Sequence, residues 1–435
     1  MAGSVVAGAG ESLSVIIAGR SVMGLGGAVI FNMSYLAFFA RTKKTTTLVA
    51  CCSASWAIGL TIGGPIGSAL AEAVSWRWAL YLNIPLTLLA FILSWFCAPD
   101  HLFDETTPLL LRLKRADPVG VLFNAAVPEL FAVALTFAGP VWEWNAIQSR
   151  AAWALFASLL IAWIVQQYFC ILTTVKERAL PLHILVRLDL IPIWIATACA
   201  GSAYAVVLIY SPLFFTFIRG ASALQQSVWL LPFTLSFICT LLLTGWFLPL
   251  IKYYKLIYIA GGALTVASSA AIATTLSVNT AQWKMMGLEA LVGVGLGLQF
   301  QHGSGISIVL NDKKSDRVDS IAFCNIAQFG GIAVTLSVSG CIFQNLGYKL
   351  LRETLHEGNM PEYAIREALA GVSSALSRES ESQQRVLSAV VKVISKIFLI
   401  VVAAGGLSLL SGLVMSPKSL DIEEMPSQAD TSELT

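Results

Sequence analysis

Ionisable and amide side chains lie inside several long apolar stretches of this chain, where such groups are costly. The first is Arg20, in the string IAGRSVMGLGGAV, about 12 Å along an apolar helix at about 1.5 Å per residue. A charge at that depth normally turns toward protein or an aqueous cavity, so Arg20 is a candidate functional residue. We expect its guanidinium inside a helical bundle, on the face that carries Gly24 and Gly27. Snorkelling to the surface is the alternative.

A second set of polar side chains lies in two apolar stretches, 284–310 and 319–345. Protonatable and amide groups at these positions could face a cavity and bind a small organic molecule, or could form ordinary hydrogen bonds between helices. The two amides of the second stretch are three residues apart and share a helical face. The candidates for a substrate cavity are Glu289, Gln299, His302, Asn325 and Gln328.

Helix-loosening residues are concentrated in the stretch 59–67, with the sequence GLTIGGPIG. Such a density is costly in a soluble helix but is tolerated among packed membrane helices. We predict a kinked, close-packed hinge formed by Gly59, Gly63, Gly64, Pro65 and Gly67. We expect no metal and no cofactor, because the cysteines form no CxxC pair and the four histidines are scattered.

Composition and the distribution of apolar residues place these groups in a membrane. The chain has 435 residues, of which 57% are apolar and 12% charged, and the apolar residues fall in blocks of about 20 or more. Its net charge of +2, with no basic stretch interleaved with aromatics, argues against binding nucleic acid. The predicted fold is an all-α polytopic transmembrane helical bundle with eleven spans, near 12–40, 45–70, 79–98, 119–140, 151–172, 190–213, 224–250, 256–277, 284–310, 319–345 and 388–415.

The loop charges predict the orientation of these spans. Alternate short loops carry fourteen lysines and arginines against four in the intervening loops. Because lysine and arginine prefer cytoplasmic loops, the first span should begin outside and the C-terminus should lie in the cytoplasm. The loops at 41–44 and 311–318 are therefore predicted to be cytoplasmic, and the polar connection 346–387 to be an outer loop.

Several strings, in a fixed order, resemble one transporter family. The strings around Arg20, at 59–67 and at 75–85 (SWRWALYLNIP) resemble the fourth to sixth helices of the fourteen-helix drug/proton antiporter branch of the major facilitator superfamily, particularly its fungal toxin and multidrug exporters. Arg20 and Gly24 match the fourth-helix pattern, although Met23 replaces its glutamine. In the fifth-helix Gly-Pro signature, the sequence departs from the family after Pro65.

Four downstream strings extend the resemblance over nearly the whole chain, at 179–187, 220–232, 291–301 and 328–345. The resemblance implies that the eleven spans correspond to the family's fourth to fourteenth helices, so that its first two to three helices, with their acidic and loop motifs, are absent. The expected segments are a partial N-terminal bundle of three spans at 1–98, a cytoplasmic loop at 99–118, two linking spans at 119–172, a C-terminal six-helix bundle at 190–415 and a cytoplasmic tail at 416–435.

The resemblance also implies a function. Two helical bundles would rock about a midplane site and export toxins, drugs or secondary metabolites, driven by inward proton flow. Arg20 would be the candidate for proton coupling, with its guanidinium inside the bundle or directed toward the absent helices. The expected partners are the small organic substrate, protons and the lipid bilayer, with the chain a monomer in the plasma membrane. The alternatives are a truncated transporter fragment without activity and a polytopic membrane enzyme, for which we find no cluster of nucleophile, base or metal ligands.

Overall fold

The structure is a computed structural model that describes residues 1–39, 45–97, 117–175, 177–180, 182–311, 313–354, 362–369, 380–417 and 419. The described residues are predominantly helical, with one isolated β-bridge between Ala138 and Trp142. The helices divide into two compact units. The first comprises residues 1–108, 221–231 and 426–435, and the second comprises 109–220 and 232–425.

The first unit is built from three long helices and shorter segments between them. Its helices are α1 (Ala2–Ala9), α2 (Leu13–Phe39), α3 (Thr45–Ala73), α4 (Trp76–Tyr81), α5 (Asn83–Cys97) and α11 (Ala223–Trp229). Helix α1 packs closely on α2, because a Cβ added to Gly19 would lie 2.5 Å from the backbone nitrogen of Ala7. Helix α3 continues through Pro65 as one helix.

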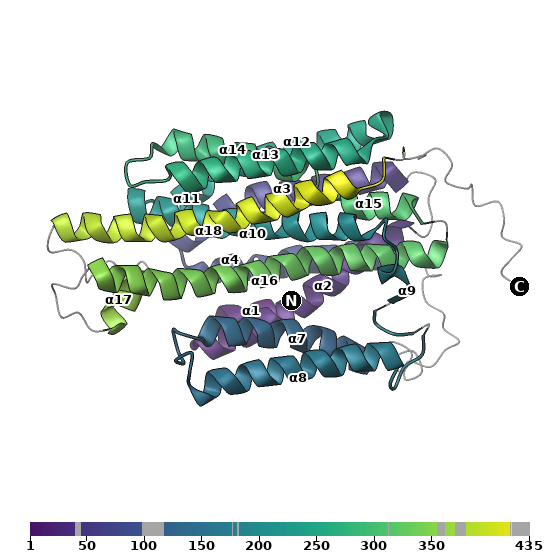
Figure 1. Ribbon diagram of the computed structural model, residues 1–435, viewed down its shortest axis with the longest axis horizontal. Coiled ribbons are helices and arrows are strands. Elements are labelled where there is room, and N and C mark those ends of the chain that lie inside the picture. Colours follow the sequence, from purple (N-terminus) through teal and green to yellow (C-terminus); the bar gives the residue numbers. More distant parts are fainter. Residues whose placement is uncertain are drawn as a thin grey trace, which may run out of the picture. The chain divides into compact units, whose positions relative to one another are not determined.

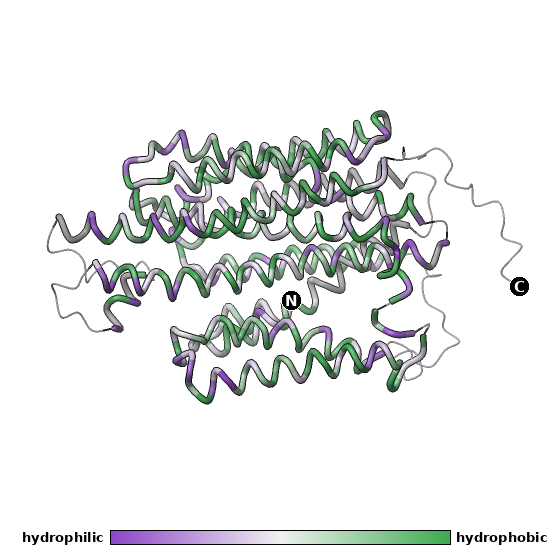
Figure 2. Tube along the Cα trace, in the orientation of Figure 1, coloured by the Kyte–Doolittle hydropathy of each residue, from purple (hydrophilic) through white to green (hydrophobic). Residues whose placement is uncertain are grey.

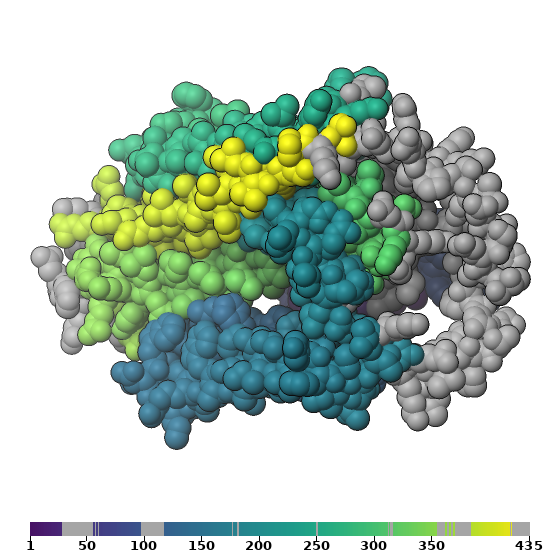
Figure 3. Space-filling model, turned by 45° about the vertical axis from the view of Figure 1, so that its right-hand side comes forward, coloured from purple at the N-terminus to yellow at the C-terminus, as the bar shows by residue number. Residues whose placement is uncertain are grey.

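The second unit contains most of the described chain. Its helices are α7 (Pro118–Phe137), α8 (Ile147–Phe169), α9 (Leu182–Leu185), α10 (Ile191–Arg219), α12 (Leu231–Ile251), α13 (Tyr254–Thr275), α14 (Gln282–Gly297), α15 (His302–Val309), α16 (Lys314–Thr354), α17 (Glu362–Leu369) and α18 (Ser380–Val414). Helices α10, α16 and α18 run side by side, and α13 packs between α18 and α14 (Figure 1). The hairpin α7–α8 packs on α16 through α7. Side chains of α18 (yellow) lie next to those of α16 (green) on the face in Figure 3.

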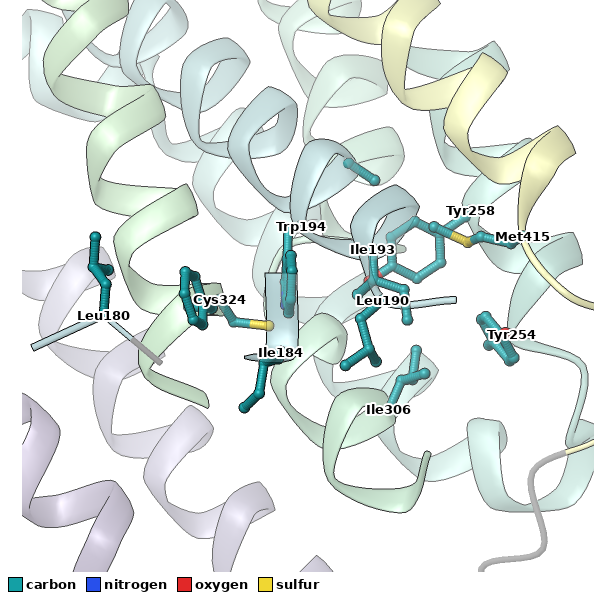
Figure 4. Packing of buried hydrophobic residues seen from close by; sticks show 12 residues of the cluster. Leu180, Ile184, Leu190, Ile193, Trp194, Tyr254, Tyr258, Ile306, Cys324 and Met415 are labelled. Atoms are coloured by element: carbon teal, nitrogen blue, oxygen red, sulfur yellow. The ribbon is translucent and has the colours of Figure 1, made fainter. Parts of the chain in front are cut away.

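A cluster of buried side chains joins several helices of the second unit (Figure 4). Trp194 at the start of α10 stacks on Phe323 of α16 with ring centroids 5.0 Å apart. Tyr254 and Tyr258 of α13 and Met415 after α18 complete the cluster. Apolar residues cover most of the length of these helices, as Figure 2 shows.

Each of the eleven predicted spans coincides with a described helix or helix pair. Eight segments are long and apolar enough to cross a membrane by length and composition, among the described residues. The other three are α2, α3 and the pair α14–α15. In α2 the qualifying apolar part is the shorter segment Leu13–Gly27, and α14–α15 is divided into helices of 16 and 8 residues.

Several helices are longer than the apolar windows that predicted them. Helix α16 continues to Thr354 and α18 begins at Ser380, so much of the predicted outer loop 346–387 is helical. Hydropathy windows end where side chains become polar, whereas backbone hydrogen bonding continues into water. Of the predicted loops and tail, 41–44, 99–116 and 420–435 lie outside the described residues.

Candidate functional site

A membrane helix of the second unit is interrupted between α14 and α15. The four residues Leu298–Gln301 form turns between the two helices. The Phe300 amide still donates to the carbonyl of Leu296, four residues back, at 2.9 Å. The Gln299 amide donates to the same carbonyl, only three residues back. Discontinuous helices leave backbone groups without helical partners, and in transporters such groups line substrate and ion sites.

Side chains from three neighbouring helices bind the groups at this break. Gln328 of α16 donates its amide N–H to the carbonyl of Phe300 at 3.3 Å. Tyr258 of α13 donates to the carbonyl of Gln299 at 3.4 Å. Ser408 of α18 donates to the side-chain oxygen of Gln299. Two of the sequence candidates, Gln299 and Gln328, therefore meet at the break.

Glycines in the string GVGLG at 293–297 let α14 approach two other helices closely. Gly293 and Gly297 face α12, and a Cβ on Gly297 would lie 2.6 Å from the carbonyl oxygen of Phe237. Gly295 faces α13, where a Cβ would lie 2.9 Å from the backbone nitrogen of Thr265. The small residues thus clamp α14 between α12 and α13, directly before the break.

Aromatic side chains surround Phe300 at the break. Tyr204 of α10 lies 5.0 Å from Phe300 between ring centroids, and Phe237 of α12 lies 5.2 Å from it, edge to face. Phe233 stacks on Phe237 at 6.1 Å. All four rings are at most 7% exposed. Aromatic contacts of this geometry fix side chains in place, so the break has a defined shape.

Glu289 lies on α14, ten residues before Gln299, and is completely buried. Neither of its carboxyl oxygens forms a hydrogen bond within the described part of the structure. The carboxyl interacts with the hydroxyl of Ser211 on α10, but the two groups do not meet the geometry of a hydrogen bond in the described part of the structure. A buried ionisable group of this kind is expensive in a membrane and marks a functional candidate. Ten helical residues span about 15 Å, so Glu289 is not part of the break.

The remaining two candidates lie within one helical turn of residues that form or bind the break. His302 is the first residue of α15, and its Nε2 atom is buried without a hydrogen bond in the described part. Its ring faces Gly245 of α12, where a Cβ would lie 3.7 Å from the ring. Asn325 is buried on α16, three residues before Gln328.

The glycine motif of α3 lies in open surroundings. A Cβ on Gly59 or Gly63 would meet no atom within 4 Å in the described part of the structure. Gly64 and Gly67 make only ordinary contacts, at 3.8 Å and 3.9 Å. The predicted close packing is therefore wrong for Gly59 and Gly63. The hinge role itself stays a prediction.

The end of α3 binds α11. Ser68 and Ser227 share a hydrogen bond of 2.5 Å between their hydroxyls. Glu72, two residues beyond the predicted span, accepts a hydrogen bond of 2.7 Å from the backbone N–H of Leu224. That bond, with another from Ser222, lowers the pKa of the Glu72 carboxyl below its ordinary value. Glu72 thus caps the first turn of α11.

Arg20 has an exposed side chain on α2. The glycines expected on its packed face, Gly24 and Gly27, meet no atom within 4 Å of an added Cβ in the described part. The close-packed face of α2 instead carries Gly19 and Met23, against α1. Within the described residues, Arg20 therefore does not lie inside a bundle beside Gly24 and Gly27. The other part of the expectation, that its guanidinium is directed toward helices absent from the chain, stays a prediction. Its role in coupling stays a prediction.

Sequence reasoning missed a buried network around Asp117. This residue is 0% exposed and caps α7, accepting from the Gly120 amide at 2.9 Å. The side-chain amides of Gln166 and Gln167 on α8 donate to it at 3.0 Å and 2.9 Å, and so does the Ala179 amide at 2.9 Å. The signal was present, because an aspartate directly before a proline is typical of a helix N-terminus.

Burial by itself would raise the pKa of the Asp117 carboxyl. The four hydrogen bonds, led by the one from Ala179, outweigh that effect and hold the pKa below its ordinary value. The network joins the start of α7, the end of α8 and the connection toward α9. It therefore anchors the predicted linking helices within the second unit.

Comparisons with known proteins agree with this architecture. Residues 1–336 match the family model described as Major Facilitator Superfamily. The chain is 30% identical to the "Efflux pump patC" of Aspergillus clavatus over 93% of this chain and 75% of that protein. It is 29% identical to the "Efflux pump alnA" of Emericella nidulans, over 97% of this chain and 77% of the relative.

A third relative is the "Phomenoic acid biosynthesis cluster MFS-type transporter" of Leptosphaeria maculans. It is 28% identical over 96% of this chain and 69% of its own length. The match to the family model covers more than half of the chain, and the described helices form a multi-pass membrane bundle. This chain therefore belongs to the Major Facilitator Superfamily of membrane transporters.

Proposed function

We propose that this chain exports small organic molecules, of the class of fungal toxins and secondary metabolites, across the plasma membrane by exchange with protons. The names of the relatives support efflux, since two are efflux pumps and one belongs to a biosynthetic cluster. The chain acts as a monomer.

The observation that carries the proposal is the interrupted helix α14–α15. Its break is bound by Gln328 and Ser408 from two other helices of the second unit. Gln299, His302, Asn325 and Gln328 supply hydrogen-bonding groups near the break, beside a cluster of buried aromatic rings. Aromatic side chains with a few hydrogen-bonding groups are the kinds of residue that line sites for small organic molecules.

The other candidates take separate roles in this proposal. Glu289 contributes an unpaired carboxyl to the substrate cavity in the second unit. Arg20 on α2 contributes the positive charge for proton coupling. Gly59, Gly63, Gly64, Pro65 and Gly67 of α3 act as the hinge. Glycine's low helix propensity and the proline favour bending at this position.

The test is efflux from yeast cells that lack their own exporters and express this exact chain. Cells with the chain should retain less of a panel of fungal metabolites than cells with an empty vector, and a protonophore should abolish the difference. Equal retention in both cells, with the protein present in the membrane, would favour the alternative of a chain without transport activity.

The break is tested separately with Gln328→Ala. This change leaves the carbonyl of Phe300 without its side-chain donor, and it should reduce efflux at least about fivefold, because an unsatisfied buried polar group costs about 1–3 kcal/mol. Gln148→Ala is the matched control, since Gln148 is exposed on α8. Equal efflux by both variants would contradict a role for the break.

A further inference from the structure

A cavity of about 560 Å³ lies at one end of the second unit. It is bounded by the residues that follow α13, Leu276–Asn279, and by the N-terminal turns of α18 from Gln384 to Ser395. In Figure 1 the first turns of α18 extend past the neighbouring end of α13. The loop charges predict that this end faces outward.

The length of α18 places the cavity at the level of the lipid headgroups. Its apolar segment Gln384–Val414 has 31 residues, or about 46 Å at 1.5 Å per residue, whereas the hydrocarbon core is about 30 Å thick. Lys255 donates to the carbonyl of Leu413 at 2.8 Å, which places a cation at the far end of α18. Counting about 20 residues back from Val414 reaches Ser395, so Lys392 lies just outside the hydrocarbon core.

The cavity has the charge of an anion site. Of the ten described residues that line it, two are cations, Arg385 and Lys392, and none is acidic. These two are seven residues apart and so lie on the same face of α18. The amides of Asn279 and Gln384 add neutral hydrogen-bond donors to the lining.

Two of the three serine hydroxyls of the lining already donate to backbone carbonyls, and the third, Ser277, shares a hydrogen bond with Thr280. Ser388 donates to the carbonyl of Arg385 at 2.7 Å, and Ser395 donates to that of Ala273 at 2.5 Å. An anion in the cavity therefore depends on the cations and amides. The apolar side chains of Val278 and Val391 supply the part of the lining that would contact hydrocarbon.

We propose that this cavity binds the phosphate group of a membrane phospholipid, with Lys392 and Arg385 contacting the phosphate oxygens. The position of the cavity at the headgroup level favours a lipid over a dissolved anion, because lipid phosphates are present at this level of the bilayer. Val278 and Val391 contact the glycerol and upper acyl carbons of the same lipid. The site is separate from the break in α14–α15 and does not depend on the exported molecule.

The experiment is a lipid titration of the purified full chain in neutral detergent, followed by native mass spectrometry. Dioleoyl phosphatidic acid should bind, and dioleoylglycerol, which lacks the phosphate, should not. Lys392→Ala should weaken binding of the phosphatidic acid about fivefold, which corresponds to about 1 kcal/mol for one basic residue near a lipid surface. Lys392→Arg keeps the cation and should retain binding.

Lys396→Ala is the matched control. Lys396 is the same residue type, one turn further along α18, equally exposed, and does not line the cavity. Equal weakening by Lys392→Ala and Lys396→Ala would overturn the proposal, since it would indicate attraction to diffuse charge. Unchanged binding by Lys392→Ala would overturn it as well. Binding of inorganic phosphate alone, lost in Lys392→Ala, would replace the lipid with a free anion.

Discussion

Helix α14 and helix α3 both carry a dense set of glycines, but the two sets have different surroundings. In α14 the space beside Gly295 and Gly297 is filled by the backbone of α13 and α12, within 3 Å of an added Cβ. In α3 the space beside Gly59 and Gly63 contains no described atom within 4 Å. The first set allows close packing. The second set has no packing requirement in the described structure, which leaves backbone flexibility as its physical contribution.

The acidic helix caps of the two units differ in the same way. Asp117 in the second unit is fully buried and accepts four hydrogen bonds. Glu72 in the first unit is exposed and caps α11 from a neighbouring helix. The comparison predicts that changes in the second unit cost stability, whereas equivalent changes in the first unit affect function with little cost.

The largest effect is expected for Asp117→Ala. The change leaves donors on Gln166, Gln167 and Ala179 without their acceptor and should cost about 3 kcal/mol, because a carboxylate that accepts buried hydrogen bonds is strongly coupled to its partners. The measurement is thermal unfolding of the purified chain in detergent. Glu143→Gln, in an exposed loop position, is the control and should leave the melting temperature unchanged.

The same residue predicts a pH dependence with a defined sign. Because the folded-state pKa of Asp117 is lowered, its contribution is complete above the ordinary aspartate pKa of about 3.9 and is lost as the pH falls below that value. The melting temperatures of the wild type and Asp117→Asn should therefore converge as the pH falls below about 4. A constant difference across that range would contradict the ionised cap.

The second effect is expected for Gly297→Ala. The added Cβ would lie 2.6 Å from the carbonyl oxygen of Phe237, and relief of this overlap should cost about 1–3 kcal/mol. Gly287→Ala, on the same helix but with no atom within 4 Å, is the matched control. It should leave stability unchanged or raise it by up to about 1 kcal/mol through helix propensity. Equal melting temperatures for the two variants would contradict the packing role of the GVGLG string.

A smaller effect is expected for Glu72→Gln. The pKa of Glu72 is lowered by the bonds from Leu224 and Ser222, so the cap of α11 is present above the ordinary glutamate pKa of about 4.3 and weakens as the pH falls through it. The substitution should shift the melting temperature less than Asp117→Asn does, because the group is exposed. Glu11→Gln, also exposed, serves as the control. A shift as large as that of Asp117→Asn would remove the distinction between the two units.

The smallest effect on stability is expected for Gly63→Ala, which adds a methyl group into open space. Helix propensity should stabilise the protein by up to about 1 kcal/mol. If α3 is a hinge, efflux should nevertheless fall, because the helix is stiffer. Gly26→Ala on α2 has equally open surroundings and should leave efflux intact. Normal efflux by Gly63→Ala would refute the hinge.

The sequence alone determined the features that depend on local chemistry and periodicity. Apolar blocks long enough to cross a bilayer predicted eleven spans, and each span coincides with a described helix or helix pair. The ordered strings around Arg20 and Pro65 predicted the family, which the comparisons confirm. The polar candidates Gln299 and Gln328 were identified because amides are conspicuous in apolar helices.

Only the tertiary structure decided which of these residues meet. Gln328 lies close to Phe300 although 28 residues separate them, whereas Glu289 lies on the same helix as the residues before the break but faces Ser211. Periodicity indicates which residues share a face and leaves open which neighbour covers that face, so Arg20 was expected on the packed side of α2 and is exposed. The network of Asp117 also depends on tertiary structure. Its donors, from Gln166 to Ala179, are distant in sequence and reach Asp117 only because α7 and α8 pack against each other. Side-chain partners of this kind depend on contacts between helices, which no local pattern specifies.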